Sequence, residues 1–154
     1  MNNDELQQLM EQVSLHYFKK KFKHKARFNA RLKTTGGRYL LLSHDIEMNP
    51  SYLAECGLDY FMSIMRHELC HYHLHLENKG YRHRDQDFKK LLQEVDAPRF
   101  SKPLKREVKV QQYSCEKCRQ VFLRRRKFNV AKYRCGNCGG KLKYIGESKV
   151  KIGE

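Results

Sequence analysis

Residues 67–71 read His-Glu-Leu-Cys-His, a spacing that could bind a metal ion and use it in catalysis. On an α-helix, residues i and i+4 lie on one face, about 40° apart around the axis at roughly 3.6 residues per turn. His67 and His71 could therefore bind one zinc ion. Glu68 beside them could orient and deprotonate a water molecule, which is the arrangement that a zinc-dependent hydrolase needs.

A helix is predicted for this motif by the apolar residues around it. They recur at spacings of three and four and would form one buried stripe: Leu58, Phe61, Met62, Met65 and Leu69. The histidines would then lie at the edge of a packed, rigid element. The alternative is that His67 and His71 are ordinary histidines on the surface of a helix that also carries His73 and His75. We expect His73 and His75 to be structural or solvated.

A catalytic zinc normally has three protein ligands, so a third is expected downstream. Gly80 is a candidate helix end, and a second amphipathic helix is predicted over residues 88–95. A chain that reverses at Gly80 can bring His83 back over His67 and His71, which makes His83 the favoured third ligand. Three nearby carboxylates remain alternatives: Glu77, Asp85 and Asp87.

A second pattern consists of two Cys-x2-Cys pairs that are separated by sixteen residues. The cysteines are Cys115, Cys118, Cys135 and Cys138. This spacing is typical of a four-thiolate zinc ribbon, in which the ion is structural because no coordination position is left for water. The alternative of two disulfides is disfavoured because the first residues do not have the pattern of a secretory signal.

The first half of the chain predicts an α+β fold. Residues 6–17 follow a helical period, whereas residues 26–32 alternate apolar and polar side chains as a half-buried strand does. Residues 38–43 and 46–49 are expected to form two further strands of an antiparallel sheet before the metal-binding helix. An edge strand of this sheet near the zinc could bind an extended substrate by backbone pairing.

With 154 residues and 40% hydrophobic content, the chain can form one domain and a small module. We expect a catalytic domain at 1–95, a linker at 96–112 because of its prolines, the ribbon at 113–145 and a basic tail at 146–154. Apolar runs such as residues 39–42 are far shorter than the roughly 20 residues that span a bilayer. The expected location is therefore the cytoplasm, without membrane association.

Positive charge is concentrated in the second part of the chain. Residues 1–95 carry 15 Lys and Arg against 12 Asp and Glu, whereas residues 96–154 carry 17 against 5. A basic run lies between the cysteine pairs: Arg124, Arg125, Arg126 and Lys127. Such a surface attracts nucleic-acid phosphates, and the nearby Phe122, Phe128 and Tyr133 could stack on unpaired bases. The alternative is a solvated loop that only keeps the protein soluble.

A second basic cluster covers residues 19–25. It follows the first predicted helix, and cations are favourable at a helix C-terminus whether or not they bind a partner. A structural role and a binding role are equally compatible with this pattern.

The segment HELCHYHLHLENKGYRHRDQDF resembles the metal-site segment of the SprT family, the zinc metallopeptidase-like group that includes Spartan. The resemblance covers roughly residues 1–140, because the later cysteines match the layout of the short bacterial SprT-like members. It implies a zincin-like domain, with His67, His71 and His83 as zinc ligands and Glu68 as the catalytic acid/base. Many members have glycine after the third histidine, whereas this chain has Arg84.

Together these features predict a zinc metalloprotease that acts on DNA-associated proteins. It would hold one catalytic and one structural Zn²⁺, bind a protein or peptide substrate at the histidine site, and bind DNA through the basic ribbon. That the proteins cut are bound to DNA is implied by the resemblance to Spartan. The alternative is a non-catalytic, zinc-containing protein that binds nucleic acid or regulates transcription through protein contacts.

Overall fold

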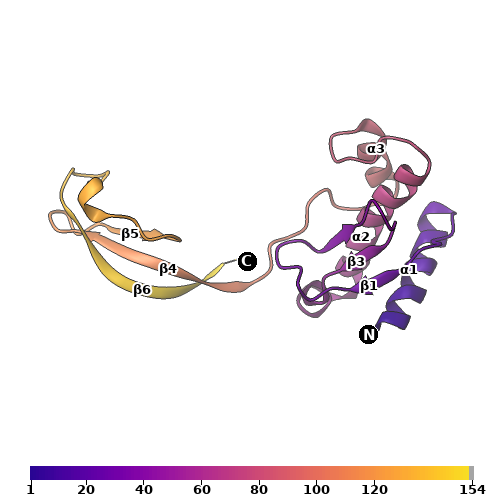
Figure 1. The fold of residues 1–154 in the computed structure, drawn as a ribbon, viewed down its shortest axis with the longest axis horizontal. Coiled ribbons are helices and arrows are strands. Elements are labelled where there is room, and N and C mark those ends of the chain that lie inside the picture. The colour runs from indigo at the N-terminus through magenta and orange to yellow at the C-terminus, as the bar shows by residue number, and fades with distance from the viewer. Residues whose placement is uncertain (153–154) are drawn as a thin grey trace. The chain divides into compact units, whose positions relative to one another are not determined.

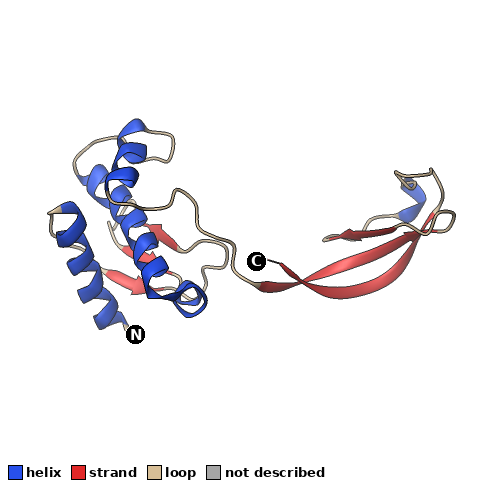
Figure 2. Ribbon diagram, turned by 180° about the vertical axis from the view of Figure 1, so that it is seen from behind, coloured by secondary structure: helices blue, strands red, loops and turns tan. Residues whose placement is uncertain are grey.

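A computed structural model describes residues 1–152, which form two compact units, residues 1–104 and residues 105–152. The first unit contains, in chain order, α1 (Asn3–Phe18), β1 (Ala26–Phe28), β2 (Gly37–Tyr39), β3 (Ile46–Met48), α2 (Pro50–Leu76) and α3 (Gln86–Glu94) (Figures 1 and 2). The second unit contains β4 (Arg106–Cys115), β5 (Val121–Arg124), a 3-10 helix (Val130–Lys132) and β6 (Leu142–Ile152). The mixed α+β class predicted from the sequence is confirmed.

The sheet of the first unit has the order β1-β3-β2, with β3 in the centre. β2 pairs with β3 in the antiparallel sense, but β1 pairs with β3 in parallel. The prediction of a purely antiparallel sheet was therefore wrong. The alternating pattern of residues 26–32 tells which face of a strand is buried, but it does not tell which strand lies beside it. All three residues of β3 are buried, as expected for a central strand.

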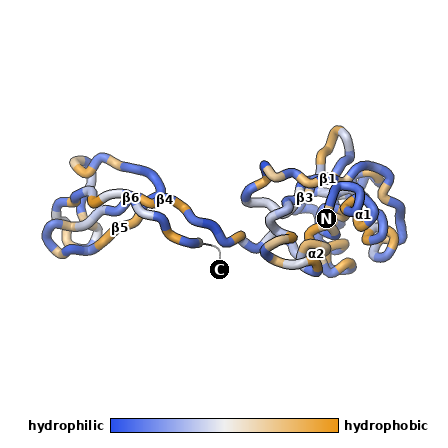
Figure 3. The backbone as a smooth tube through the Cα atoms, turned by 90° about the horizontal axis from the view of Figure 1, so that it is seen from below, coloured by the Kyte–Doolittle hydropathy of each residue, from blue (hydrophilic) through white to orange (hydrophobic). Residues whose placement is uncertain are grey.

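The core of the first unit lies between this sheet, α1 and α2. Its largest fully buried side chains include Leu6 and Met10 of α1, Ile46 of β3, and Phe61 and Met65 of α2. In the predicted stripe of α2, Phe61, Met65 and Leu69 are fully buried and Met62 is half-buried, but Leu58 is 46% exposed, so the prediction was wrong at that position. Hydrophobic and hydrophilic stretches are short and follow one another along the backbone of both units (Figure 3). No helix among residues 1–152 is long and apolar enough to cross a membrane.

The segment after α3 binds to the first unit instead of forming a free linker. Two tyrosines of α2 hold the backbone of Lys102, because its N–H donates to the Tyr60 hydroxyl and its carbonyl accepts from the Tyr52 hydroxyl, both at 2.7 Å. Arg66 also donates to the Asp96 carbonyl at 2.9 Å. We call residues 96–104 the strap. The prolines in this segment suggested a linker, but they do not prevent the neighbouring backbone groups from bonding to side chains of α2.

The second unit is a three-stranded sheet of order β5-β4-β6, antiparallel throughout. The pairing of β4 with β6 begins at Arg106 and Ile152. Residues 106–112 of the expected linker and residues 146–152 of the expected basic tail are thus strands, and residues 153 and 154 lie outside the described part. The sequence prediction missed this pairing because the paired residues lie 27 to 46 positions apart in the chain. Both strands are also rich in charged residues, which weakens their apolar alternation.

His73 is a buried histidine on the side of α2 that faces α1. Its Nε2–H donates to the Ser14 hydroxyl at 2.8 Å, because that hydroxyl donates its own proton to the Lys20 carbonyl at 2.7 Å. The side chain is only 5% exposed, and burial, assisted by the charge of Lys20, lowers the pKa of His73 to about 4. The imidazole therefore has a structural role and is neutral at pH 7.

This burial predicts acid sensitivity of the first unit. The folded state disfavours protonated His73. The contribution of the neutral ring to the free energy of unfolding is therefore fully present above the unfolded-state pKa of about 6.5, and it is lost as the pH falls from there toward 4. The loss between pH 7 and 4.5 amounts to about 2–3 kcal/mol. We expect His73→Gln to be less stable at pH 7 but to lose less stability on acidification, measured by urea unfolding followed through the helical circular dichroism signal. His16→Gln, at an exposed position of α1, is the control; an equal pH dependence in both variants would contradict the prediction.

Candidate metal sites

Three histidine side chains converge in the first unit. His67 and His71 lie one turn apart on α2, and His83 lies in the turn before α3. The Nε2 atoms are 3.3 Å apart between His67 and His71, 3.2 Å between His67 and His83, and 3.1 Å between His71 and His83. Nitrogens bound to one tetrahedral zinc ion at roughly 2.0–2.1 Å are about 3.3–3.4 Å apart. The three imidazoles therefore have the spacing of zinc ligands.

Backbone carbonyls determine which ring nitrogen carries the proton in two of these imidazoles. The Nδ1 of His67 lies 2.6 Å from the Pro98 carbonyl of the strap, and the Nδ1 of His71 lies 2.5 Å from the Tyr81 carbonyl. A carbonyl can only accept, so each Nδ1 must donate, and each neutral ring then has a lone pair on Nε2. These lone pairs point at one another, an arrangement that repels unless a cation lies between them. The fit to a divalent metal ion thus rests on bonding as well as distance.

The electrostatics of the pocket keep the imidazoles in the form that binds metals. Burial lowers the pKa of His67 to about 4 and the pKa of His71 to about 3. The pKa of His83 is also lowered, first by burial and then by the charge of Arg99. All three rings are therefore neutral near pH 7, as metal ligation requires.

Glu68 lies beside the histidines and lines the same pocket. Its side chain is only 6% exposed, and burial raises its pKa to about 8. A divalent cation nearby would lower that pKa again and favour the carboxylate. Gly37 of β2 lies against this side chain, since a Cβ atom at Gly37 would be 3.0 Å from the Glu68 Cγ. The glycine allows the edge strand to approach the carboxyl group closely.

The pocket around the histidines has a volume of about 600 Å³. β2, an edge strand of the sheet, contributes Gly37, Arg38 and Tyr39 to one wall. The strap contributes Arg99 and Phe100 to the lining. An extended peptide could thus pair with the free edge of β2 beside the three imidazoles.

The carboxylates that competed with His83 as third ligand have other partners. Glu77 forms ion pairs with Lys20 and Lys79. Asp85 and Asp87 accept backbone N–H bonds from the turn before α3, at 3.0 and 2.9 Å. They stabilise the turn that carries the third histidine.

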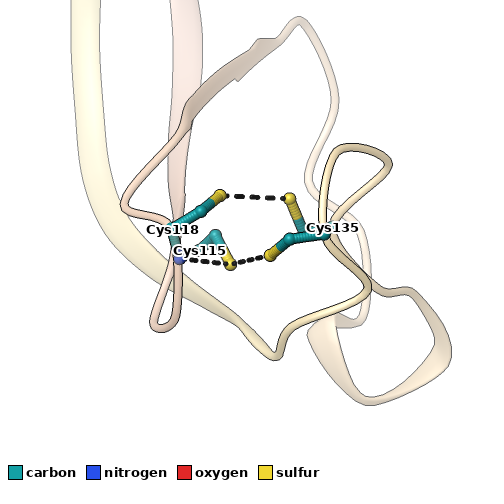
Figure 4. A group of neighbouring side chains, drawn as sticks. Cys115, Cys118 and Cys135 are labelled. Atoms are coloured by element: carbon teal, nitrogen blue, oxygen red, sulfur yellow. Dashed lines mark hydrogen bonds between the residues drawn. The ribbon is translucent and has the colours of Figure 1, made fainter.

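The four cysteines form a second cluster in the second unit. The Sγ atoms of Cys115 and Cys138 are 3.4 Å apart, and those of Cys118 and Cys135 are 3.6 Å apart. Figure 4 shows the thiols of Cys118 and Cys135 pointing toward each other from two separate loops. Disulfide sulfurs are about 2.05 Å apart, whereas thiolates at roughly 2.3 Å from one tetrahedral zinc ion are about 3.8 Å apart. The cluster therefore fits a closed, four-thiolate site.

Backbone amides support these thiols. The N–H groups of Lys117 and Cys118 donate to the Cys115 Sγ at 3.3 and 3.4 Å, and that of Asn137 donates to the Cys135 Sγ at 3.4 Å. The two bonds to Cys115, and most of all the one from the Cys118 N–H, lower the pKa of Cys115 to about 6. Negative charge on the sulfur is favoured at this position, as in a metal thiolate.

The basic run begins at the last residue of β5 and is exposed at all four positions, Arg124, Arg125, Arg126 and Lys127. The aromatic residues beside it have mixed roles. Phe128 stacks on Tyr113 at a centroid distance of 3.9 Å and so stabilises the ribbon, whereas Tyr133 is 56% exposed. Phe122, Phe128 and Tyr133 also line a hollow of about 460 Å³. Basic and aromatic side chains thus share one surface of the second unit.

Comparison with known proteins identifies the family. The model of the SprT-like family matches residues 6–114, which include all three histidines and Glu68. The chain belongs to the SprT-like family. The protein called "Protein SprT-like" from Bacillus subtilis (strain 168) is 57% identical over 148 residues, which is 94% of this chain and 99% of that protein. A protein of the same name from Geobacillus sp. (strain WCH70) is 54% identical over 147 residues, 92% of this chain and 95% of the relative.

A third SprT-like relative, from Bacillus cereus (strain B4264), is 51% identical over 151 residues, 96% of this chain and 99% of that protein. The similarity to these SprT-like proteins therefore extends through both units and includes both the histidine and the cysteine cluster. No solved structure was found to match the chain.

Two features of the histidine site were missed by the sequence prediction, namely the carbonyls of Pro98 and Tyr81 that orient the ligand rings. A backbone carbonyl has no residue-type signature, so no pattern in the sequence could have identified it. The role of the residues of both clusters as metal ligands remains a prediction that their geometry supports.

Proposed function

We propose that this chain is a zinc-dependent peptidase that acts on proteins bound to nucleic acid. The proposal rests on the convergence of three Nε2 atoms, 3.1–3.3 Å apart, beside the buried Glu68 in an accessible pocket. His67, His71 and His83 would hold the zinc ion of this site. The four thiolates of the second unit would hold a structural zinc ion.

Each group of the pocket would have a defined part in peptide hydrolysis. When bound, zinc would supply Lewis acidity toward the scissile carbonyl and lower the pKa of a water molecule. The Glu68 carboxylate would accept the proton of that water and pass it to the leaving amine. The edge of β2 would hold the substrate backbone, and the strap, through Pro98, would keep the His67 ring in its ligating orientation.

The second unit would supply the nucleic-acid contact. Its exposed basic run and the neighbouring Tyr133 present cations and an aromatic surface together. Such a surface attracts phosphate backbones without reading the base sequence. Attachment to DNA would raise the effective concentration of the proteins that occupy the same DNA.

A second candidate function is a non-catalytic nucleic-acid-binding or regulatory protein in which the histidine site is structural. The charge distribution favours it, since 15 of the 32 Lys and Arg residues fall in residues 105–154, in the unit that does not contain the histidine cluster. Both candidates predict salt-sensitive DNA binding. They differ in whether proteolysis occurs.

Cleavage that depends on the histidine site tests the proposal. The zinc-loaded full chain would be incubated with a DNA-binding protein on plasmid DNA, and fragments would be followed by gel electrophoresis. We expect His83→Ala to lower the cleavage rate at least about a hundredfold because one metal ligand is lost, while the four-thiolate ribbon and DNA binding are kept. His16→Ala, at an exposed histidine of α1, should cleave normally. DNA binding without any cleavage by the unsubstituted chain would favour the second candidate function. Undiminished cleavage by His83→Ala would show that the histidine site is not the site of cleavage.

A further inference from the structure

The net positive charge of the first unit comes from one short segment, residues 19–27. Residues 1–104 carry 17 Lys and Arg against 13 Asp and Glu. Six of these cations lie in residues 19–27, which contain no acidic residue. The rest of the unit carries 11 cations against 13 acidic groups, so residues 19–27 account for the whole of its positive excess.

Three lysines in this segment point outward from an anchored backbone. Lys21, Lys23 and Lys25 are exposed, whereas Phe22 and Ala26 are each only 4% exposed and His24 is half-buried. This alternation separates an apolar inner side from a cationic outer side. We call Lys21, Lys23 and Lys25 the lysine ridge.

Contacts from α1, α2 and the start of β3 hold the backbone of the lysine ridge. The Lys23 N–H donates to the Tyr72 hydroxyl at 3.0 Å, and the Lys25 N–H donates to the Asp45 carboxylate at 3.0 Å. Gln7 binds the same segment twice, because its amide N–H donates to the His24 carbonyl at 2.9 Å and its amide oxygen accepts from the Ala26 N–H at 2.6 Å. The three ammonium groups are thus carried by a backbone that is already ordered, which reduces the entropy lost on binding a partner.

Stabilisation of the C-terminus of α1 by nearby cations does not account for the lysine ridge. Lys19 donates to a carbonyl of the last turn of α1, and Lys20 pairs with Glu77. Lys19 therefore stabilises the end of α1, and Lys20 is engaged in an ion pair with the residue that follows α2. The lysine ridge lies beyond them, outside the first or last turn within which the helix dipole acts.

We infer that the lysine ridge is a second nucleic-acid contact, which binds the phosphate backbone with the first unit while the basic run binds it with the second. A phosphate backbone is favoured over a lipid surface because stable anchoring of a basic segment on a membrane takes a second, apolar group that inserts, and both apolar residues of segment 19–27, Phe22 and Ala26, are buried. Two contacts on one polymer strengthen each other through effective concentration.

The ridge would also bring nucleic acid close to the histidine site. Tyr72, which binds the Lys23 N–H, directly follows His71 in α2. The backbone of the lysine ridge and the histidine site are therefore contacted by adjacent residues of α2, whose side chains leave the helix about 100° apart. A protein bound to the same nucleic acid would lie near the pocket, which the ribbon contact alone does not ensure.

The salt dependence of DNA binding by the full chain tests this inference. The variant Lys21→Gln/Lys23→Gln/Lys25→Gln would be compared with Arg31→Gln/Lys33→Gln/Lys90→Gln, which removes three exposed cations elsewhere on the same unit. Fluorescence anisotropy with a labelled duplex would give the slope of log K against log[salt]. Loss of three phosphate contacts should flatten the slope by about 2–3 and weaken binding at low salt at least about tenfold, with little change in the control variant.

The following results would contradict the inference, the proposed function or both. An unchanged slope, or equal flattening in both variants, overturns the inference. A third variant would replace the basic run, residues 124–127, by Gln. If this variant loses DNA binding while the ridge variant binds normally, the inference about the lysine ridge is wrong but the proposed function is unaffected. If the unsubstituted chain binds phosphatidylserine vesicles but not the duplex, both the ridge and the nucleic-acid part of the proposed function fail.

Discussion

Glu68→Gln is expected to abolish peptide cleavage while the chain still binds two zinc ions. The amide has the shape of the acid, so it fits against Gly37 and leaves the three imidazoles in place. It cannot accept the proton of a water molecule, and loss of a general base typically lowers the rate by about 10²–10⁴-fold. Cleavage of a DNA-bound protein and zinc content by metal analysis would be measured on the same preparation.

The matched control is Glu77→Gln, the same substitution at a carboxylate that pairs with Lys20 and Lys79 away from the pocket. This variant should cleave at the normal rate. If Glu68→Gln cleaved as fast as the unsubstituted chain, Glu68 would have no part in the reaction. If it lost zinc as well as activity, the carboxyl group would be needed for metal binding, and its assignment as a base would fail.

Gly140→Ala is expected to remove the ribbon zinc without affecting the first unit. A Cβ atom at this position would lie 2.7 Å from the Cys115 Sγ and 3.3 Å from the Cys138 Sγ. Relief of the contact requires the Cys115 sulfur to move by several tenths of an ångström, which exceeds the tolerance of about 0.2 Å for metal-ligand distances. Zinc binding supplies on the order of 10 kcal/mol to the folding of such small modules, so the second unit should unfold when the site is lost.

The control for this variant is Gly136→Ala in the same loop, where an added Cβ would meet no atom within 4 Å. We expect one zinc ion per chain in Gly140→Ala and two in Gly136→Ala by metal analysis. In Gly140→Ala, limited proteolysis should degrade residues 105–154 and spare the first unit. Two zinc ions bound with normal affinity in Gly140→Ala would show that the cluster is not built as a closed four-thiolate site.

Sequence spacing was sufficient for the local parts of both sites. Histidines at i and i+4 share a helix face for geometric reasons, and two Cys-x2-Cys pairs form two tight turns that can each present a pair of thiols. The helical period around His67 and His71 also predicted the buried positions of Phe61, Met65 and Leu69. These inferences need only short-range geometry.

Long-range pairing was beyond the sequence patterns. The position of β3 between β1 and β2, and the pairing of β4 with β6, depend on which strands lie side by side. The two-residue period is the same for parallel and antiparallel neighbours, so it could not decide between them. The prolines of the strap likewise suggested a linker, although Tyr52 and Tyr60 bind its backbone.

By itself, then, the sequence determined the donor atoms: two imidazoles and a carboxyl group on one helix, a third imidazole within reach, and four thiols. Only the tertiary structure decided that His83 lies 3.1–3.2 Å from the other two rings while Glu77, Asp85 and Asp87 are engaged elsewhere. It also decided that the Pro98 and Tyr81 carbonyls fix the ring protons. The physical reason is that ligand types follow from side-chain chemistry, whereas their protonation and convergence depend on backbone groups brought together by folding.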